Sequence, residues 1–330
     1  MKAFRSLAEV PADFGPSIVT IGNFDGVHAG HREILRRVAA VAGERGLVPV
    51  VLTFDPHPAR VLAPERAPKL IHTVGQRLRR MESEGVQAAL LLPFSMEFAR
   101  LSPEEFARTV LAETLRARVV IVGDDFRFGH KQAGDIATLR ELGKTLGFEV
   151  ESAGAIQRRA ERISSTAIRK LVEAGRVSRA CRMLGQPFAL EGPVVSGHGI
   201  GKQKTVPTLN LDPENELLPA TGVYVTRTRD LDSGRVWNSI TNVGYRPTFE
   251  GHDLTYETFL LDPFDGSTPR RIEVSFLYFI REEKKFDMPE LLREQILKDV
   301  VRANRVHEIV AQVLSHAPGI ILSQRPPDQE

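Results

Sequence analysis

Two histidines, His28 and His31, stand at the start of a predicted helix, directly after a glycine-rich turn. The apolar run Ile18–Ile21, which is typical of a buried strand, precedes that turn. Backbone N–H groups and the positive end of the helix dipole attract phosphate at such a helix start. Imidazoles there can donate hydrogen bonds to phosphate oxygens and stabilise charge that develops during phosphoryl chemistry. The segment Gly22–His31 therefore predicts a nucleotide-phosphate site.

Two other interpretations of these histidines are a helix cap beside a surface imidazole, and a metal site. No nearby cluster of cysteines or carboxylates completes a metal site around the pair. The order of strand, glycine-rich turn and helix favours phosphate over both alternatives.

A second polar cluster opens another predicted helix, which runs to Gly175. It consists of three hydroxyl residues and an arginine: Ser164, Ser165, Thr166 and Arg169. Hydroxyls at this position cap a helix, and capping is one interpretation of the cluster. The other interpretation is binding of pyrophosphate, because the arginine lies one turn into the helix and its planar guanidinium can donate two parallel hydrogen bonds.

The second half of the chain contains a glycine-rich loop and two polar strand positions. The loop residues are Gly197, Gly199, Gly201 and Lys202. Thr208 and Asn210 share one face if their segment is extended, and their oxygens can then bind a hard cation such as Mg²⁺ on nucleotide phosphates. Glu257 lies in a strand-like run and could accept the proton of an attacking alcohol. A flexible loop, an ordinary strand and an exposed carboxylate are the alternatives.

The elements that must position these residues differ between the two halves. In the first half, strand-like runs alternate with helical patterns, which predicts a parallel sheet with helices on both faces and ligands at the carboxyl ends of its strands. From about Phe188 strand-like segments follow one another until Pro289, which predicts a small antiparallel β-barrel capped by a C-terminal helix. The fold class is thus α/β plus β. We predict domains at residues 1–186 and 187–316 and a tail at 317–330.

The composition argues against several classes of protein. A formal net charge of +2 over 330 residues is too small to indicate binding to nucleic acid or to an acidic membrane surface. No apolar run approaches the ~20 residues that span a bilayer. The single cysteine, Cys181, cannot form an intramolecular disulfide, which fits a reducing compartment. We therefore expect a cytoplasmic protein without nucleic-acid or membrane partners, whose oligomeric state stays open.

Four ordered motifs of the first half resemble the adenylyltransferase module of bacterial bifunctional riboflavin kinase/FAD synthetases. They are Gly22–His31, Thr53–Pro58, Gly123–Gly129 and Ser164–Arg169. The resemblance implies a Rossmann-like nucleotidyltransferase sheet on which FMN phosphate attacks the α-phosphorus of ATP, giving FAD and pyrophosphate. Positioning of the substrates and stabilisation of charge then account for the rate enhancement, because no covalent enzyme intermediate is expected.

The same resemblance implies roles for individual residues of the first module. His28, His31 and Arg169 would be catalytic. Contacts to ATP phosphates would come from Gly22, Asn23, Phe24, Asp25, Gly30, Ser164, Ser165 and Thr166. Flavin or nucleotide contacts would come from His57, Asp125 and Phe128. His57 stands between two prolines, so shaping a turn is the alternative for it.

Three segments of the second half resemble the riboflavin kinase module of the same family: Pro207–Asn210, Asn242–Phe249 and Tyr256–Glu257. The resemblance implies transfer of the ATP γ-phosphate to the 5′-hydroxyl of riboflavin, giving FMN and ADP. Thr208 and Asn210 would ligate Mg²⁺, Glu257 would act as general base, and the Gly197–Gly201 loop with Lys202 would cover the phosphates.

The chain departs from the family pattern at two places in this module. Thr205-Val206 stands where the family has Gly-Phe, and Gly266–Pro269 stands where it has a Tyr-Gly pair. Two alternatives to a bifunctional enzyme follow: a FAD synthetase with a weakened or inactive kinase module, and a non-catalytic flavin-binding protein.

Overall fold

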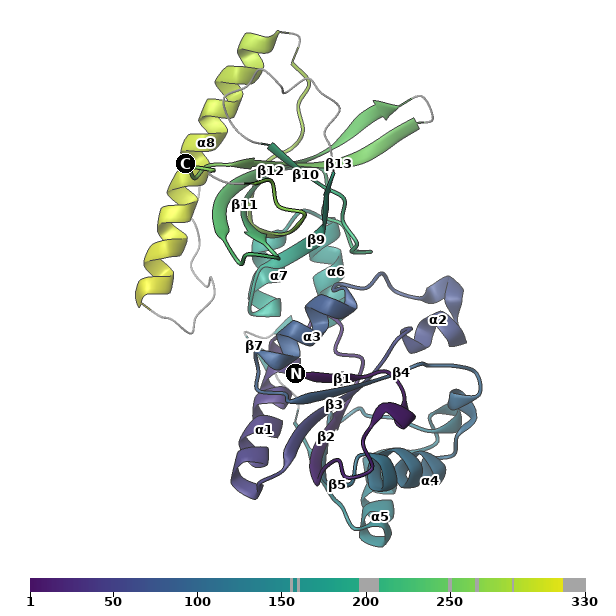
Figure 1. Cartoon of the computed structure of the whole chain (residues 1–330). Helices are drawn as coiled ribbons and strands as arrows, with labels where there is room; N and C mark the ends of the chain where they lie inside the picture. The colour runs from purple at the N-terminus through teal and green to yellow at the C-terminus, as the bar shows by residue number, and fades with distance from the viewer. Residues whose placement is uncertain are drawn as a thin grey trace. The chain divides into compact units, whose positions relative to one another are not determined.

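The computed structural model describes residues 1–154, 157–158, 161–195, 208–248, 251–264, 267–286 and 288–316 (Figure 1). Its contacts divide the chain into two compact units. The first comprises Met1–Lys69 and Thr73–Ile163, and the second comprises Leu70–His72 and Ser164–Glu330. None of the helices within these described ranges combines the length and apolarity needed to cross a membrane.

The first unit contains a parallel six-stranded sheet in the order β1-β4-β3-β2-β5-β6. Its strands are β1 (Lys2–Phe4), β2 (Ser17–Ile21), β3 (Val48–Phe54), β4 (Ala88–Leu92), β5 (Ala117–Val122) and β6 (Glu149–Ser152). In this order β3 and β4 lie on one side of β2, whereas β5 and β6 lie on the other. The succession of strands therefore changes from one side of the sheet to the other at β2. Ligands of open α/β sheets bind beyond the carboxyl ends of strands at such a point.

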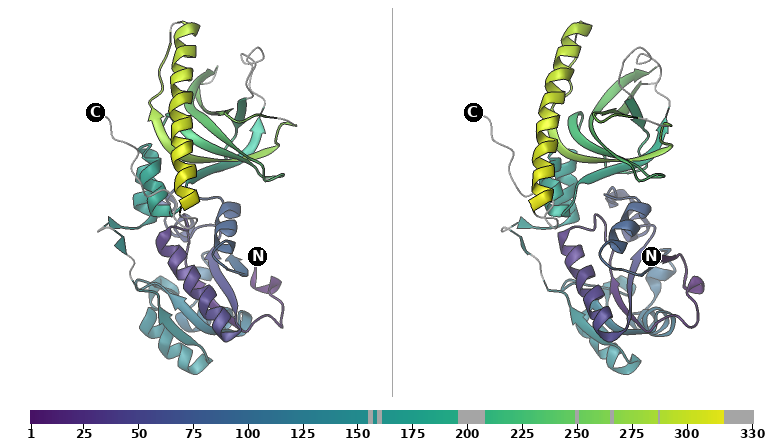
Figure 2. Two further views of the ribbon diagram at one scale, coloured as in Figure 1. Left: turned by 90° about the vertical axis from the view of Figure 1, so that its left-hand side faces the viewer. Right: turned by 60° about the vertical axis from the view of Figure 1, so that its left-hand side comes forward.

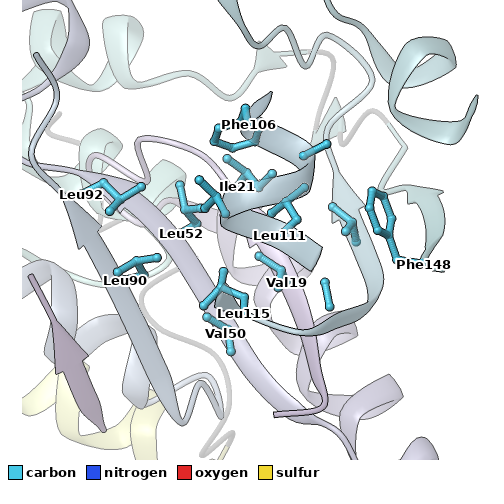
Figure 3. Packing of buried hydrophobic residues seen from close by; sticks show 14 of the residues in the cluster. Val19, Ile21, Val50, Leu52, Leu90, Leu92, Phe106, Leu111, Leu115 and Phe148 are labelled. Atoms are coloured by element: carbon cyan, nitrogen blue, oxygen red, sulfur yellow. The ribbon is translucent and has the colours of Figure 1, made fainter. Parts of the chain in front are cut away.

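Helices cover both faces of this sheet, as the sequence predicted. They are α1 (Ala29–Arg45), α2 (Pro58–Leu62), α3 (Val74–Glu82), α4 (Pro103–Phe106), a π-helical continuation (Ala107–Thr114) and α5 (Ile136–Leu146). Val19 and Ile21 pack on one face against Leu111 and other residues of the α4 to α5 region (Figure 3). Ile18 packs on the other face against Val38 of α1. Because both faces are covered, β2 and β4 are buried at every position, which explains their continuous apolar runs.

The second unit contains a closed antiparallel barrel in the order β10-β13-β12-β11-β14-β9. The elements of this unit are α6 (Ser165–Glu173), α7 (Val177–Leu184), β9 (Phe188–Val195), β10 (Thr208–Leu211), β11 (Gly222–Asp230), β12 (Val236–Thr248), β13 (Gly251–Leu260), β14 (Arg271–Arg281) and α8 (Pro289–His316). A short hairpin, β7 (Gln157–Arg158) with β8 (Glu161–Arg162), precedes α6. Barrel and terminal helix agree with the sequence prediction.

Helix α8 lies along the outside of the barrel (Figure 2). Ala303 of this helix is buried against Val225 and Ile240 of the barrel wall. At the end of β14, Arg281 forms an ion pair with Asp299 of α8 at 2.8 Å. Side chains on the inner face of the wall fill the barrel, and many of them are aromatic. The others include buried hydroxyl residues that hydrogen-bond to one another: Thr226, Thr228, Ser239, Thr241 and Thr258.

Helices α6 and α7 and the short segment Leu70–His72 belong with the barrel by their contacts. The Ser178 hydroxyl of α7 donates to the carbonyl of Leu277 in β14 at 2.9 Å. The Leu70 N–H donates to the Glu216 carboxylate at 2.9 Å, and the Leu217 N–H donates to the Leu70 carbonyl at 3.2 Å. These contacts join segments that are far apart in sequence. The second unit therefore begins earlier in the chain than Phe188, where the sequence pattern changes from alternating strands and helices to consecutive strands.

Candidate active sites

The turn that follows β2 is held in a strained conformation. Phe24 and Val27 adopt positive φ values of 48° and 39°, and Gly26 adopts 86°. For residues with a side chain this left-handed region costs free energy and persists only where the surroundings hold it. Phe24 and Val27 are buried, and the Val27 N–H donates to the Phe24 carbonyl at 3.2 Å. The turn thus carries α1 away from the carboxyl end of the central strand in one fixed direction.

His28 is the N-cap of α1, and its ring faces His31. The Nδ1 atom of His28 accepts a hydrogen bond from the His31 backbone N–H at 3.3 Å. Since Nδ1 accepts, the neutral ring carries its proton on Nε2, which is then a donor for a ligand oxygen. The two imidazoles stack with their centroids 3.7 Å apart and their planes 13° apart. Both histidines predicted for phosphate chemistry therefore lie together at one helix N-terminus.

Burial keeps both imidazoles neutral near pH 7. Desolvation lowers the pKa of His28 from 6.5 to about 4, against a smaller opposing effect of its backbone hydrogen bond. Desolvation also lowers the pKa of His31 well below 6.5, and the charge of His28 lowers it further. The Nδ1 atom of His31 is buried and has no hydrogen-bond partner within the described ranges. A phosphate anion beside these rings would raise both pKa values.

The other predicted phosphate residues of this turn have different surroundings. Gly22, Asn23 and Gly30 are half-buried, whereas Asp25 is only 3% exposed. The ring of Phe24 is 2% exposed and contacts the ring of His31 at a centroid distance of 5.0 Å. Phe24 therefore supports a histidine with its side chain. The carbonyl of Asn23 accepts a hydrogen bond from the Thr53 hydroxyl at 3.2 Å, which joins this turn to β3.

The three predicted flavin or nucleotide residues lie on loops beyond β3 and β5. His57 caps α2, where its Nδ1 accepts from the Ala59 N–H at 3.2 Å, so it does shape that turn. Asp125 is exposed. Phe128 is 7% exposed and belongs to the apolar core, where its ring stacks on Phe126 at 5.4 Å. Phe126 is half-buried and was not predicted from the sequence.

The hydroxyl cluster begins α6 and lies in the second unit by its contacts. Ser164 is the N-cap, and its hydroxyl accepts from the Ala167 N–H at 3.3 Å. Ser165 and Arg169 are half-buried, and Thr166 is exposed. Capping is thus part of the cluster's role. That this cluster and the histidine pair bind phosphates of the same ATP molecule remains a prediction.

Strand register brings the predicted kinase residues onto one face of the barrel wall. Asn210 of β10 lies directly opposite Glu257 of β13, and Glu257 lies directly opposite Asn242 of β12. Directly opposite residues of antiparallel strands project to the same side, with Cβ atoms about 5 Å apart. Thr208 precedes Asn210 by two positions and shares that face. The face is an amide–carboxylate–amide row with a hydroxyl beside it.

The row lies on the outer face of the barrel wall. Leu209, Tyr256 and Thr258, which alternate with the row, are buried on the inner side. Asn210 and Glu257 are half-buried, and Thr208 is exposed. The predicted loop residues Gly197, Gly199, Gly201 and Lys202 lie outside the described residues.

Sequence reasoning did not select Asn242 as a site residue. Its place in the Asn242–Phe249 motif was the available signal, but only the register shows that it neighbours Glu257. Gly244 follows on the same face. A Cβ atom on Gly244 would collide with the Glu283 carboxylate and come within 3.2 Å of the Asn242 amide nitrogen. Glu283 is thus a second carboxylate near this row.

No group of three or more histidine, cysteine or carboxylate side chains within the described ranges is arranged to hold a metal ion. Thr208 and Asn210, the two residues predicted to hold Mg²⁺, offer hard oxygen donors of the kind that suits a divalent cation bound to nucleotide phosphates.

One chain thus joins a parallel sheet with imidazoles beyond its central strand to a barrel with a carboxylate among amides, and the family matches identify it as a transferase with two catalytic modules. Models of two families match the chain: FAD synthetase over residues 10–167 and riboflavin kinase over residues 184–307. The chain belongs to the bifunctional riboflavin kinase/FMN adenylyltransferase family.

Relatives of that name match over nearly their whole length. The protein of Pseudomonas fluorescens is 36% identical over 304 residues, covering 92% of this chain and 97% of the relative. That of Escherichia coli K12 is 33% identical over 303 residues, covering 92% and 96%. A crystal structure from Streptococcus pneumoniae, described as a macrolide-efflux protein, aligns with a TM-score of 0.80 and 29% identity over 92% of this chain and 98% of that one.

Proposed function

We propose that this chain makes two flavin nucleotides in succession and uses ATP in both steps. It phosphorylates riboflavin to FMN with release of ADP, and it adenylylates FMN to FAD with release of pyrophosphate. The observation that carries the proposal is the match of both family models, one on the sheet and one on the barrel, each over candidate catalytic residues. Neither alternative, an inactive kinase module or a non-catalytic flavin binder, has support in these matches.

In the adenylyltransferase module, an oxygen of the FMN phosphate attacks the α-phosphorus of ATP, and the bond from that phosphorus to the pyrophosphate oxygen breaks. The Nε2–H of His28 donates to a phosphate oxygen, and the first N–H groups of α1 add their dipoles. His31 keeps the His28 ring in place by stacking and by its N–H. Ser164, Ser165, Thr166 and Arg169 hold the departing pyrophosphate.

In the kinase module, the 5′-hydroxyl oxygen of riboflavin attacks the γ-phosphorus of ATP, and the bond to the ADP oxygen breaks. Glu257 accepts the hydroxyl proton. The amides of Asn210 and Asn242 lie on either side of this carboxylate and orient it. Because an amide can donate to a carboxylate without neutralising it, the base keeps its charge until the proton arrives.

ATP-using enzymes of both kinds need a divalent metal ion, and we assign Mg²⁺ to this role. Thr208 and Asn210 would hold it in the kinase module, since hydroxyl and amide oxygens suit this hard cation. The ion would neutralise phosphate charge on the bound ATP. We place the reactions in the cytoplasm, in accord with a single, buried, free cysteine, Cys181.

A time course with the purified chain, riboflavin, ATP and Mg²⁺, followed by chromatography, tests the proposal. FMN should appear first and FAD should follow, with ADP and pyrophosphate formed in step with each. FAD formed from added FMN, but no FMN formed from riboflavin, would reduce the chain to a FAD synthetase. Flavin binding without either product would overturn both activities.

A further inference from the structure

Arg77 of α3 is a buried arginine beside the turn Gly22–His28, which we call the histidine turn. The residue is 2% exposed, although arginine is almost always a surface side chain. Its Nη1 donates to the carbonyl of Asn23 at 3.0 Å, and its Nη2 donates to the carbonyl of Phe54 at 3.3 Å. One planar guanidinium therefore joins the turn after β2 to the last residue of β3.

The Asn23 carbonyl has two donors, which fixes its direction. The Thr53 hydroxyl donates to it at 3.2 Å in addition to Arg77 at 3.0 Å. A carbonyl oxygen has two lone pairs, and here both have partners. The peptide that contains this carbonyl leads into Phe24, the first residue of the turn with a positive φ. Arg77 thus holds the peptide on which the strained conformation begins.

Phe24 in turn restricts the positions of both imidazoles through its ring and its carbonyl. The Phe24 ring contacts the His31 ring at 5.0 Å, and the His31 ring stacks on His28 at 3.7 Å. The Phe24 carbonyl accepts from the Val27 N–H, immediately before His28. A rotation of the Asn23 peptide would move the Phe24 ring and carbonyl, and both histidines would follow.

A buried guanidinium is a costly way to stabilise a fold. Burial lowers its pKa, and the nearby carboxylates of Asp25 and Asp55 oppose that effect by attraction. Its Nε atom is buried without a hydrogen-bond partner within the described residues. Removing a charged group from water costs free energy, so a buried guanidinium is a costly means of binding two backbone carbonyls if stability is its only role.

We propose that Arg77 is a positioning residue for adenylyl transfer, which fixes the His28 and His31 rings through its hydrogen bonds to the Asn23 and Phe54 carbonyls. The proposal rests on the adenylyltransferase activity proposed above. In this role Arg77 acts on the reaction through the turn that it holds.

Two substitutions in the full chain test this role. Arg77→Met keeps the length of the side chain and removes all its donors, whereas Arg77→Lys keeps a cation that can reach one carbonyl at a time. We expect Arg77→Met to lower kcat for FAD formation about 100-fold, because a catalytic group displaced by roughly 1 Å loses that much. KM for FMN should change little, and Arg77→Lys should recover part of kcat.

The same chain supplies the controls. Riboflavin phosphorylation by the same preparations should stay within about twofold of the wild type, since it uses the barrel. Arg79→Met, an exposed position of the same helix, should leave both reactions unchanged. An unchanged kcat for FAD formation in Arg77→Met would overturn the proposal. If Arg77→Met does not fold, a wild-type kcat in Arg77→Lys would do so.

A second measurement does not depend on turnover. Long-range ¹H–¹⁵N spectra of the histidine rings report which nitrogen accepts and which carries the proton. We expect the His28 Nδ1 signal to lose its hydrogen-bonded shift in Arg77→Lys. A wild-type spectrum in that variant would contradict the positioning role. If the wild-type chain formed no FAD, the proposed function would fail while this spectrum still tested Arg77.

Discussion

The two imidazoles of the histidine turn are neutral near pH 7 because burial disfavours their charged forms. Burial lowers the pKa of His28 to about 4 and the pKa of His31 well below its usual 6.5. At neutral pH a nucleotide phosphate bound here would therefore meet neutral N–H donors at the positive end of a helix. Such a phosphate would raise the pKa of the rings, and a ring that gains a proton would stabilise the negative charge of the transition state.

These pKa shifts also make the stability of the fold depend on pH. Between pH 6.5 and about 4 the unfolded chain binds protons at these histidines that the folded chain does not bind. The free energy of unfolding should therefore fall as the pH falls through this window, and these residues should not change it above pH 6.5. His28→Asn, which keeps a capping side chain, should lose less stability than the wild type between pH 7 and pH 5 in urea titrations.

The matched control for that titration is His130→Asn, at an exposed position of the same unit. It should show the pH dependence of the wild type. An equal loss of stability in His28→Asn and the wild type would contradict the assignment of the low pKa to His28.

Sequence reasoning found the residues that stand in recognisable patterns and missed those defined by packing. His28, His31 and Glu257 stand in motifs, and the structure places the first two together. Arg77 lies in a helix that also contains Arg79 and Arg80, and no feature of the sequence separates it from them. Its burial depends on how α3 packs on the sheet, which is information that only the three-dimensional structure contains.

Among the elements, strand pairing brings together the residues proposed for the kinase site. Three neighbouring strands, β10, β13 and β12, each contribute one polar side chain at the same level of the ladder. A shift of one residue in any strand would turn its side chain into the barrel interior. The apolar residues that alternate with the row, Leu209 and Tyr256 among them, fix the register by their burial.

Gly244 provides a test of this row. In Gly244→Ala the new methyl group would displace the Glu283 carboxylate and press on the Asn242 amide, which lies beside Glu257. Glu283 is exposed and can move away, so the midpoint of thermal unfolding should change little. We expect kcat/KM for riboflavin phosphorylation to fall roughly tenfold, with FAD formation from FMN unchanged.

Gly43→Ala is the control for that measurement, because a Cβ atom there meets open space. It should leave both reactions at wild-type rates. Riboflavin phosphorylation at the wild-type rate in Gly244→Ala would contradict a catalytic row on this face.

Most elements were predictable because their patterns are strong. The strand predicted from the apolar run Ile18–Ile21 lies within β2, and the consecutive strand-like segments predicted from about Phe188 to Pro289 correspond to β9 through β14. β1 was not predicted, because three residues with one buried side chain show no periodicity. The hairpin of β7 and β8 was missed for the same reason: each strand has two residues.

At the scale of the whole molecule, two modules share one chain, and the predicted boundary at residue 186 remains a proposal. The change from alternating strands and helices to consecutive strands was visible in the sequence. The attachment of α6, α7 and Leu70–His72 to the barrel was not, because it arises from contacts between distant segments. The alternating pattern reports local structure, and it carries no signal for such contacts.

In the proposed function, the two reactions use separate residues of the same chain. His28→Asn and Glu257→Gln, compared in one chromatographic time course of riboflavin, FMN and FAD, test it most directly. We expect His28→Asn to form FMN at the wild-type rate and to slow FAD formation by about 100-fold or more. Glu257→Gln should slow FMN formation by about 100-fold or more and convert added FMN to FAD as the wild type does. Loss of both reactions in each folded variant, or of neither, would contradict the separation of the two sites.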